Sequence, residues 1–298
     1  MSLAHLTRRV ETHLRGRVGN LRAESLEGEP IAGLSFYRRT APTEFQAFVY
    51  DPLVCLILQG TKETSVGDRM LRASAGEHIV VSHDLPVVAR ITEASEDRPY
   101  VALIARLDVS ELRSLHDEVG GAGEADASGA YAVAPVDDAL LAVLTRYVAL
   151  LDEPAAAPVL VPLIRRELSY RLLHAGNGAM LRTLLHRDSH ASRIGRAIDR
   201  LRNSYRERLE VPALARSVGM STSAFHKHFR RVTATTPLQY QKDLRLTEAR
   251  RLLESEAHSV STAAFEVGYE SATQFSREFS RKFGAPPSAL RGRTAAAS

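Results

Sequence analysis

A repeat in the last third of the 298-residue chain limits its possible folds more than any other sequence feature. The first copy contains Ala215, Gly219 and Ser221, followed by Phe225 and Phe229. The second copy has Ala264, Gly268, Ser271, Phe275 and Phe279 in the corresponding places. The two glycines lie 49 residues apart and the last two phenylalanines 50 apart. Near-equal offsets are typical of a duplicated structural unit and not of a chance helical hairpin.

Each copy has the residues that a helix-turn-helix unit needs, and we expect the two units at about 211–232 and 260–283. A small alanine lets two helices approach closely, and the glycine supplies the positive φ that ends the first helix. The serine can cap the second helix, and phenylalanines spaced i, i+4 bury one of its faces. The opposite face is polar in both copies, with Thr222, Ser223, His226, Lys227 and Arg230 in the first and Thr273, Gln274, Ser276, Arg277 and Arg281 in the second. Because a helix fits the major groove of DNA, these ten residues are predicted DNA contacts.

Position and charge suggest different roles within this set. Arg277 lies midway along the second polar face and can grip a base edge with two hydrogen bonds. Lys227 holds the matching place in the first unit, but an ammonium group cannot fork as a guanidinium does. The residues that we expect to clamp phosphates are Arg230, Arg231, Arg281 and Lys282.

The charge of the chain is divided unevenly. Residues 187–298 hold 20 Lys and Arg against 11 Asp and Glu, a formal net charge of +9, whereas the first 186 residues carry −5, which together give the +4 of the whole chain. A basic module beside an acidic one favours a polyanion as partner of the basic part.

The helical region resembles a known family over residues 192–291. Its closing pattern, with Phe275, Phe279, Phe283-Gly284, Pro286-Pro287 and Arg291, and the placing of Tyr240, Arg245 and Ala249 resemble the DNA-binding domain of AraC/XylS transcription regulators. The resemblance implies two helix-turn-helix units bridged by a long helix over about 237–254. It also implies double-stranded promoter or operator DNA and RNA polymerase as partners, and activation of transcription as the function. Ala234 departs from the pattern, because a glycine usually stands before Pro237, and we expect this turn to differ in detail from the family's.

The N-terminal part of the chain has short apolar and β-branched runs separated by turn residues, as is typical of a small antiparallel β-domain. We expect strands near 34–37, 53–58, 78–81, 87–91 and 100–104, and a hairpin that turns at Gly67-Asp68. Four short sequence segments resemble the N-terminal sensor region of one AraC-type subfamily. They are Pro52–Gly60, Gly76–Ser82, Leu85-Pro86-Val87 and Glu167–Leu173. That resemblance implies a cupin-like barrel with helices, a small-molecule effector and dimerisation.

The predicted fold class is therefore α+β multidomain: an antiparallel cupin-like β-barrel with flanking helices, then an all-α double helix-turn-helix domain. The predicted division is a helical lead-in over 1–30, a sensor or dimerisation domain over 31–186, a hinge over 187–191 and a DNA-binding domain over 192–298. Within it we expect a loop over 124–134, a helix from Asp137-Asp138 to about Leu151 and one from about Val159 to His174. The expected helix caps are Ser110 and Ser192.

The histidines and the single cysteine bear on other functions. His78 and His83 are the two histidines of the predicted barrel, and they lie five residues apart without forming a His-x-His pair, so the sequence predicts no metal and no cofactor. No Ser, His and Asp set stands out, so it predicts no catalytic residue either. An alternative is a cupin-type enzyme with a helical assembly domain, and another is a sensor that regulates through protein contacts. Cys55 lies in an apolar strand, where it is either a core residue or lines an effector pocket as a sensing thiol.

The single cysteine excludes an intramolecular disulfide. The first 20 residues lack the apolar region of a signal peptide, and no apolar run approaches the length of a membrane span. We therefore expect a cytoplasmic protein that does not act at a membrane.

Overall fold

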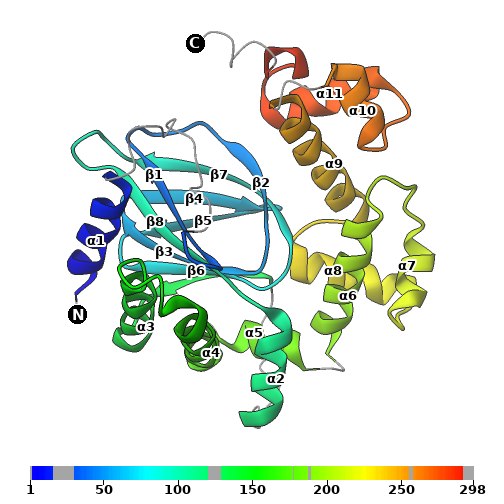
Figure 1. Cartoon of the computed structure of the whole chain (residues 1–298). Coiled ribbons are helices and arrows are strands. Elements are labelled where there is room, and N and C mark those ends of the chain that lie inside the picture. Colours follow the sequence, from blue (N-terminus) through cyan, green and yellow to red (C-terminus); the bar gives the residue numbers. More distant parts are fainter. Residues whose placement is uncertain are drawn as a thin grey trace.

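A computed structural model describes residues 2–15, 30–119, 129–176, 178–186, 189–254 and 258–290. The strands lie on one side of the molecule, and the helices that follow residue 189 lie on the other (Figure 1). None of the helices described is long and apolar enough to cross a membrane.

In the described ranges, nine antiparallel strands form two facing sheets, an arrangement that the short apolar runs predict. The strands are β1 (Leu34–Arg39), β2 (Gln46–Tyr50), β3 (Leu53–Gln59), β4 (Thr61–Val66), β5 (Arg69–Ser74), β6 (Glu77–Val81), β7 (Leu85–Glu93), β8 (Tyr100–Arg106) and β9 (Tyr131–Pro135). One sheet has the order β1-β8-β3-β6-β9 and the other the order β2-β7-β4-β5. The hairpin between β4 and β5 turns at Gly67-Asp68, which confirms that prediction.

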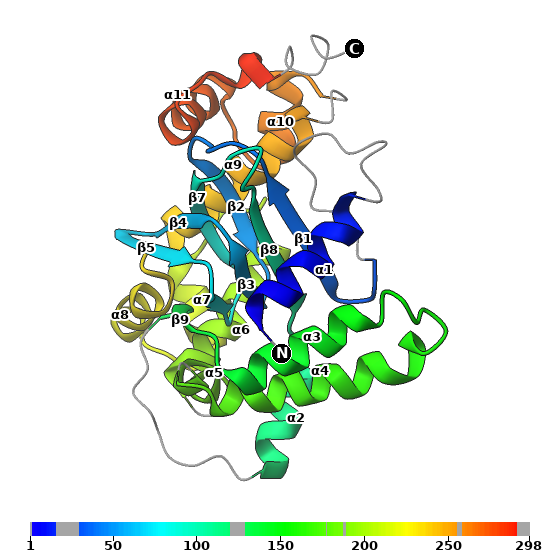
Figure 2. The same cartoon turned by 90° about the vertical axis from the view of Figure 1, so that its left-hand side faces the viewer.

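The period-2 alternation of β3 divides the apolar core of this domain. Cys55 and Ile57 face the interior between the two sheets, whereas Val54 and Leu56 face the helices outside. These outer helices are α1 (Leu3–Arg15), α2 (Val109–Val119), α3 (Asp138–Ala149), α4 (Ala157–His174) and α5 (Gly178–Leu185). Figure 2 shows α1, α3 and α4 lying along the five-stranded sheet. The sheet is therefore buried on both faces, which explains the continuous apolar run of β3.

The helical domain consists of two small units joined by a long helix. Its helices are α6 (His190–Asn203), α7 (Val211–Ser217), α8 (Thr222–Thr233), α9 (Pro237–Glu254), α10 (Val260–Glu266) and α11 (Ala272–Phe283), followed by the 3₁₀ turn η1 (Pro287–Leu290). Helix α9 coincides with the predicted bridge. The first unit shares one apolar cluster with the interior of the β-domain, whereas the second unit has a cluster of its own.

Contacts from α6, α8 and α9 hold the first unit and the helices beside it against the open end of the sheets. The Tyr240 hydroxyl donates to the Asp84 carbonyl at 2.5 Å, and the Ala130 amide donates to the Val232 carbonyl at 2.9 Å. Arg202 pairs with the Asp84 carboxylate at 2.6 Å. These contacts join two segments more than a hundred residues apart, so the β-domain and the first unit pack as one body.

The structure corrects three local predictions. The expected loop over 124–134 contains most of strand β9, which pairs with β6; residues 124–128 lie outside the described part. Ser189 and not Ser192 caps α6, since its Oγ accepts from the Ser192 amide at 2.9 Å. Asp108 and not Ser110 caps α2, because its carboxylate accepts from the amides of Ser110 and Glu111. The end of the lead-in, residues 187 and 188 of the expected hinge and Arg291 lie outside the described residues, while residues 189–191 form the cap and the first residues of α6.

Candidate nucleic-acid interface and interior cavity

The first helix-turn-helix unit is built as its sequence predicts. Gly219 has φ 70° after α7, a conformation that favours glycine. The Ser221 Oγ accepts from the Ala224 amide at 3.3 Å and caps α8, while Phe225 and Phe229 are fully buried. Helix α8 ends at Ala234, which has φ 55°. Ala234, which stands where the family pattern has glycine, therefore still forms a left-handed cap, but alanine is strained in this conformation.

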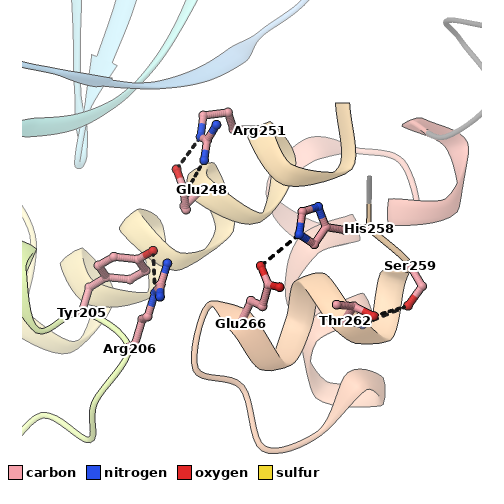
Figure 3. Close-up of polar contacts among 8 residues, drawn as sticks. All are labelled: Tyr205, Arg206, Glu248, Arg251, His258, Ser259, Thr262 and Glu266. Carbon is pink, nitrogen blue, oxygen red and sulfur yellow. Dashed lines mark hydrogen bonds and ion pairs between the residues drawn. The ribbon is translucent and has the colours of Figure 1, made fainter. Parts of the chain in front are cut away.

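The second unit repeats this construction. Ser271 caps α11 by accepting from the Gln274 amide at 3.3 Å, and Gly268 has φ 89°. A Cβ on Gly268 would lie 2.2 Å from the Arg206 carbonyl oxygen, so this turn requires glycine both for its φ and for close packing. Figure 3 shows Ser259 at the start of α10, where its Oγ accepts from the Thr262 amide at 3.0 Å.

The ten predicted DNA contacts lie on the outer faces of α8 and α11. Nine of them are exposed and Ser276 is half-buried. Within the described part of the chain, Lys227 and Arg277 make no hydrogen bond or ion pair, so both are free to meet a ligand. Gln274 donates to Glu278 at 3.3 Å, and Arg230 lies 3.6 Å from the Asp68 carboxylate at the tip of the β4–β5 hairpin.

Helix α9 holds the second unit through ion pairs. Lys242 pairs with Glu278 at 2.8 Å, and Lys282 pairs with Asp243 at 2.5 Å. Only 13% of the Lys282 side chain is exposed, so it is largely buried against α9. Lys282 therefore holds the second unit in place, and it is not the exposed phosphate clamp that the sequence predicted.

One arginine of α9, Arg245, joins the two units. Arg245 is part of the family pattern, but this role was not predicted from the sequence. Arg245 donates to the carbonyl oxygens of Tyr205 at 2.7 Å, Arg206 at 3.0 Å and Glu207 at 2.8 Å, all before α7. It also donates at 2.8 Å to the carbonyl oxygen of Gly268, in the turn of the second unit. Four donors of one guanidinium therefore fix how the units sit on α9. Burial lowers the pKa of Arg245 from its ordinary value, but the group keeps its charge.

A second candidate site is a cavity of about 60 Å³ between the two sheets. Its walls include Tyr37, Phe48, Tyr50, Cys55, Lys62 and Tyr100. Only 5% of Cys55 is exposed, and burial raises the pKa of its thiol, so the neutral thiol dominates. The cavity adjoins a cleft of about 540 Å³ between β2 and α9, and Tyr37, Gln46 and Phe48 line both.

The sequence prediction named Cys55 in this cavity but missed Lys62 and Tyr100. The alternation of β4 could have found Lys62, because it shares a face with the buried Thr64 and Val66. The two histidines considered as metal ligands are both buried. Among the residues described, no three His, Cys, Asp or Glu side chains are grouped so as to hold a metal ion.

Two family models match the chain, and together they cover both domains. Residues 30–180 match the AraC-type transcriptional regulator N-terminus, and residues 214–293 match a helix-turn-helix domain. The chain is 33% identical over 91 residues to the HTH-type transcriptional activator RhaS of Pectobacterium carotovorum, which is 30% of this chain and 33% of RhaS. It is 34% identical over 122 residues to the RCS-specific HTH-type transcriptional activator RclR of Escherichia coli, which is 41% of this chain and 37% of RclR. The chain thus spans only about a third of the length of the curated relatives that it matches.

A solved structure shares the whole architecture. Wild-type ToxT of Vibrio cholerae with a bound unsaturated fatty acid superposes with a TM-score of 0.57 over 87% of this chain and 94% of that one, at 10% sequence identity. This likeness concerns the fold: two antiparallel sheets followed by the two-unit helical domain. The N-terminal match alone covers half of the sequence, and with it the chain belongs to the AraC-type transcriptional regulators.

Proposed function

We propose that the chain regulates transcription by placing α8 and α11 in successive major grooves on one side of a DNA duplex. The observation that carries this proposal is that two serine-capped helices present exposed polar faces from units joined by one helix. Helix α9 has 18 residues and is thus roughly 27 Å long, close to the groove repeat of roughly 34 Å. A rigid bridge of this length suits two adjacent grooves.

In this mode Arg277 reads a base pair, and Lys227 holds the matching place in the first unit. The free state of both side chains supports the assignment. Arg230 and Arg281 neutralise phosphates, while the remaining contacts are Thr222, Ser223, His226, Thr273, Gln274 and Ser276. Binding to DNA then accounts for the function without catalysis.

A salt titration tests this proposal. For a chosen duplex, the logarithm of the binding constant should fall with the logarithm of the salt concentration, with a slope of roughly −0.9 for each phosphate that is neutralised. We expect a slope of several units. An affinity that does not depend on salt would refute the proposal and favour regulation through protein contacts.

The relatives named as activators support activation over repression, with RNA polymerase as the second partner. We propose that the chain raises transcription from a promoter that carries its binding site. Transcription in vitro with purified RNA polymerase tests this, since a fall in transcript on adding the chain would show repression instead.

We also propose that the β-domain binds a small-molecule effector, because its interior holds a cavity that opens beside α9. An effector there would contact the body that carries the first unit. The fatty acid bound to ToxT is an example of a small molecule held by this fold.

An exposed apolar stripe on α4 supports a homodimer. Val159 is 67% exposed and Leu163 61% exposed, and Tyr170 continues the same helical face. Leu163→Glu should convert a dimer to a monomer in sedimentation velocity. Met70→Glu is the matched control, because Met70 is a similarly exposed apolar residue on β5. An unmodified chain that sediments as a monomer at tens of micromolar would refute this proposal.

A further inference from the structure

We infer that the cavity between the sheets binds a small organic carboxylate, held by the Lys62 ammonium group and the Tyr100 hydroxyl. The inference rests on the proposed role of the β-domain in binding an effector, and it names the chemical class of that effector.

Among the residues that the structure describes, Lys62 has no counter-ion inside the β-domain. It lies on β4 on the same face as Thr64 and Val66, which are both buried. Its Nζ contacts the Tyr50 hydroxyl and lies 4.9 Å from the centre of the Tyr50 ring and 6.0 Å from that of Phe48. In the part of the chain that the structure describes, no Asp or Glu oxygen lies within ion-pair distance of it. Aromatic faces compensate a half-buried charge only partly, so an anion is the missing partner.

Tyr100 provides a second unsatisfied donor in the same cavity. Its side chain is fully buried, and its hydroxyl has no hydrogen-bond partner among the described residues. Burial raises the pKa of Tyr100 well above its ordinary value, so the group keeps its proton and can donate it. Buried hydroxyls are nearly always paired, which indicates that an acceptor belongs here. A carboxylate has enough oxygen lone pairs to meet both groups at once.

The remaining walls indicate what the carboxylate is attached to. Ala89, Ala102, Ile91 and Ile104 form an apolar surface without a second uncompensated cation. A polyanion such as phosphate would need more donors than this surface has, whereas an aliphatic group fits it.

The size of the cavity limits the ligand. Because one water-sized sphere takes up roughly 10–15 Å³, a cavity of about 60 Å³ holds roughly four to six non-hydrogen atoms. Propionate, butyrate and isobutyrate are of this size. A longer chain would have to extend into the cleft beside α9, past Tyr37 and Phe48.

Isothermal calorimetry on the full chain tests the inference with these three carboxylates, with isobutyramide as a neutral molecule of the same shape, and with palmitoleate as a long carboxylate. We expect at least one short carboxylate to bind at least about tenfold more tightly than the amide, which corresponds to the loss of one charge-assisted contact. Binding of none of the three, equal binding of the amide, or tighter binding of palmitoleate would each overturn the inference.

Variants locate the site. Lys62→Met should weaken the bound carboxylate at least about tenfold, and Tyr100→Phe should weaken it by a smaller factor. Arg72→Met is the matched control, because Arg72 is an exposed cation on the neighbouring strand that pairs with Glu93. Lys62→Met should fold, since it removes a charge that has no counter-ion, and circular dichroism checks this. A folded Lys62→Met protein that binds the carboxylate as the unmodified chain does would also overturn the inference.

DNA binding separates this inference from the proposed function. A chain that binds its selected DNA site but no short carboxylate refutes the ligand class alone. A chain that selects no DNA sequence refutes the regulatory role, whatever the calorimetry shows.

Discussion

Replacing Arg245 by methionine should loosen the joint between the two helix-turn-helix units while leaving each unit folded. The guanidinium donates to the carbonyl oxygens of Tyr205, Arg206, Glu207 and Gly268. Hydrogen bonds from a charged group contribute about 1.5–3 kcal/mol each. Adding the four bonds would give a value comparable with the total stability of a domain, which is only about 5–15 kcal/mol. The sum therefore overstates what this one side chain contributes.

The structure shows which of the four bonds matter most. The carbonyl oxygens of Tyr205 and Glu207 also accept from Gln241 Nε2, at 2.9 and 2.7 Å, so they keep one partner in the variant. The bond to Arg206 lies at the exposed surface, where water can replace it. The bond to Gly268 is partly buried, and no second side-chain donor to this carbonyl oxygen is found among the described residues. We therefore expect Arg245→Met to lower the free energy of unfolding by about 3 kcal/mol. Arg245→Lys should lose less, since an ammonium group keeps a donor but cannot fork.

Urea denaturation followed by circular dichroism measures this loss, and hydrogen exchange places it. Protection should fall in α10 and before α7, and much less in the β-domain. Arg251→Met is the control, because Arg251 is exposed and pairs with Glu248 at the surface (Figure 3), where a pair contributes about 0–1 kcal/mol. Equal stabilities of the Arg245→Met and Arg251→Met proteins would refute the reasoning.

Four further predictions concern the turn, the interface, the thiol and pH. Gly67→Ala should separate the first unit from the β-domain, because the new Cβ would lie 2.1 Å from the Ala234 carbonyl oxygen; unchanged protease resistance of this interface would contradict it. Arg277→Ala should cost about 1–3 kcal/mol on the selected site and relax one base pair, whereas Arg281→Ala should weaken all sequences alike and lower the salt slope by about one; a uniform loss for Arg277→Ala in binding titrations would make it a phosphate contact. Cys55→Ser should cost about 1–3 kcal/mol by burying a hydroxyl, and a stable Cys55→Ala chain that no longer responds to its effector would identify a sensing thiol. Burial lowers the pKa of His83 from 6.5 to about 4, so the folded protein disfavours protonation of this group. The free energy of unfolding should therefore be highest above pH 6.5 and fall by about 3 kcal/mol as the pH falls to 4. Denaturation across this range should show a shallower decline for His83→Gln.

The helical domain could be predicted from the sequence because its signals are local. A glycine that ends a helix, a serine that caps the next and two phenylalanines at i, i+4 act within a dozen residues. Both units and the bridge over 237–254 therefore appear where the sequence predicts them.

The features that the sequence did not predict depend on distant partners. Strand β9 is a short apolar run of five residues, Tyr131–Pro135, that begins two residues after Gly129, and it is a strand because it pairs with β6. Ser192 has the residue type of a cap, but Ser189 accepts from its amide one turn earlier. The cavity needs Lys62 from one sheet and Tyr100 from the other, and no local pattern joins them.

Selection of bound sequences from random DNA with the full chain tests the central claim most directly. Two capped helices on one bridge predict a selected site with two short blocks of preferred base pairs, about 10–10.5 base pairs apart from centre to centre. Arg277→Ala should relax one position in one block only and leave the other block unchanged. Recovery of no preferred sequence, or of a single block that is the same for the Arg277→Ala protein, would contradict the claim that both units read DNA.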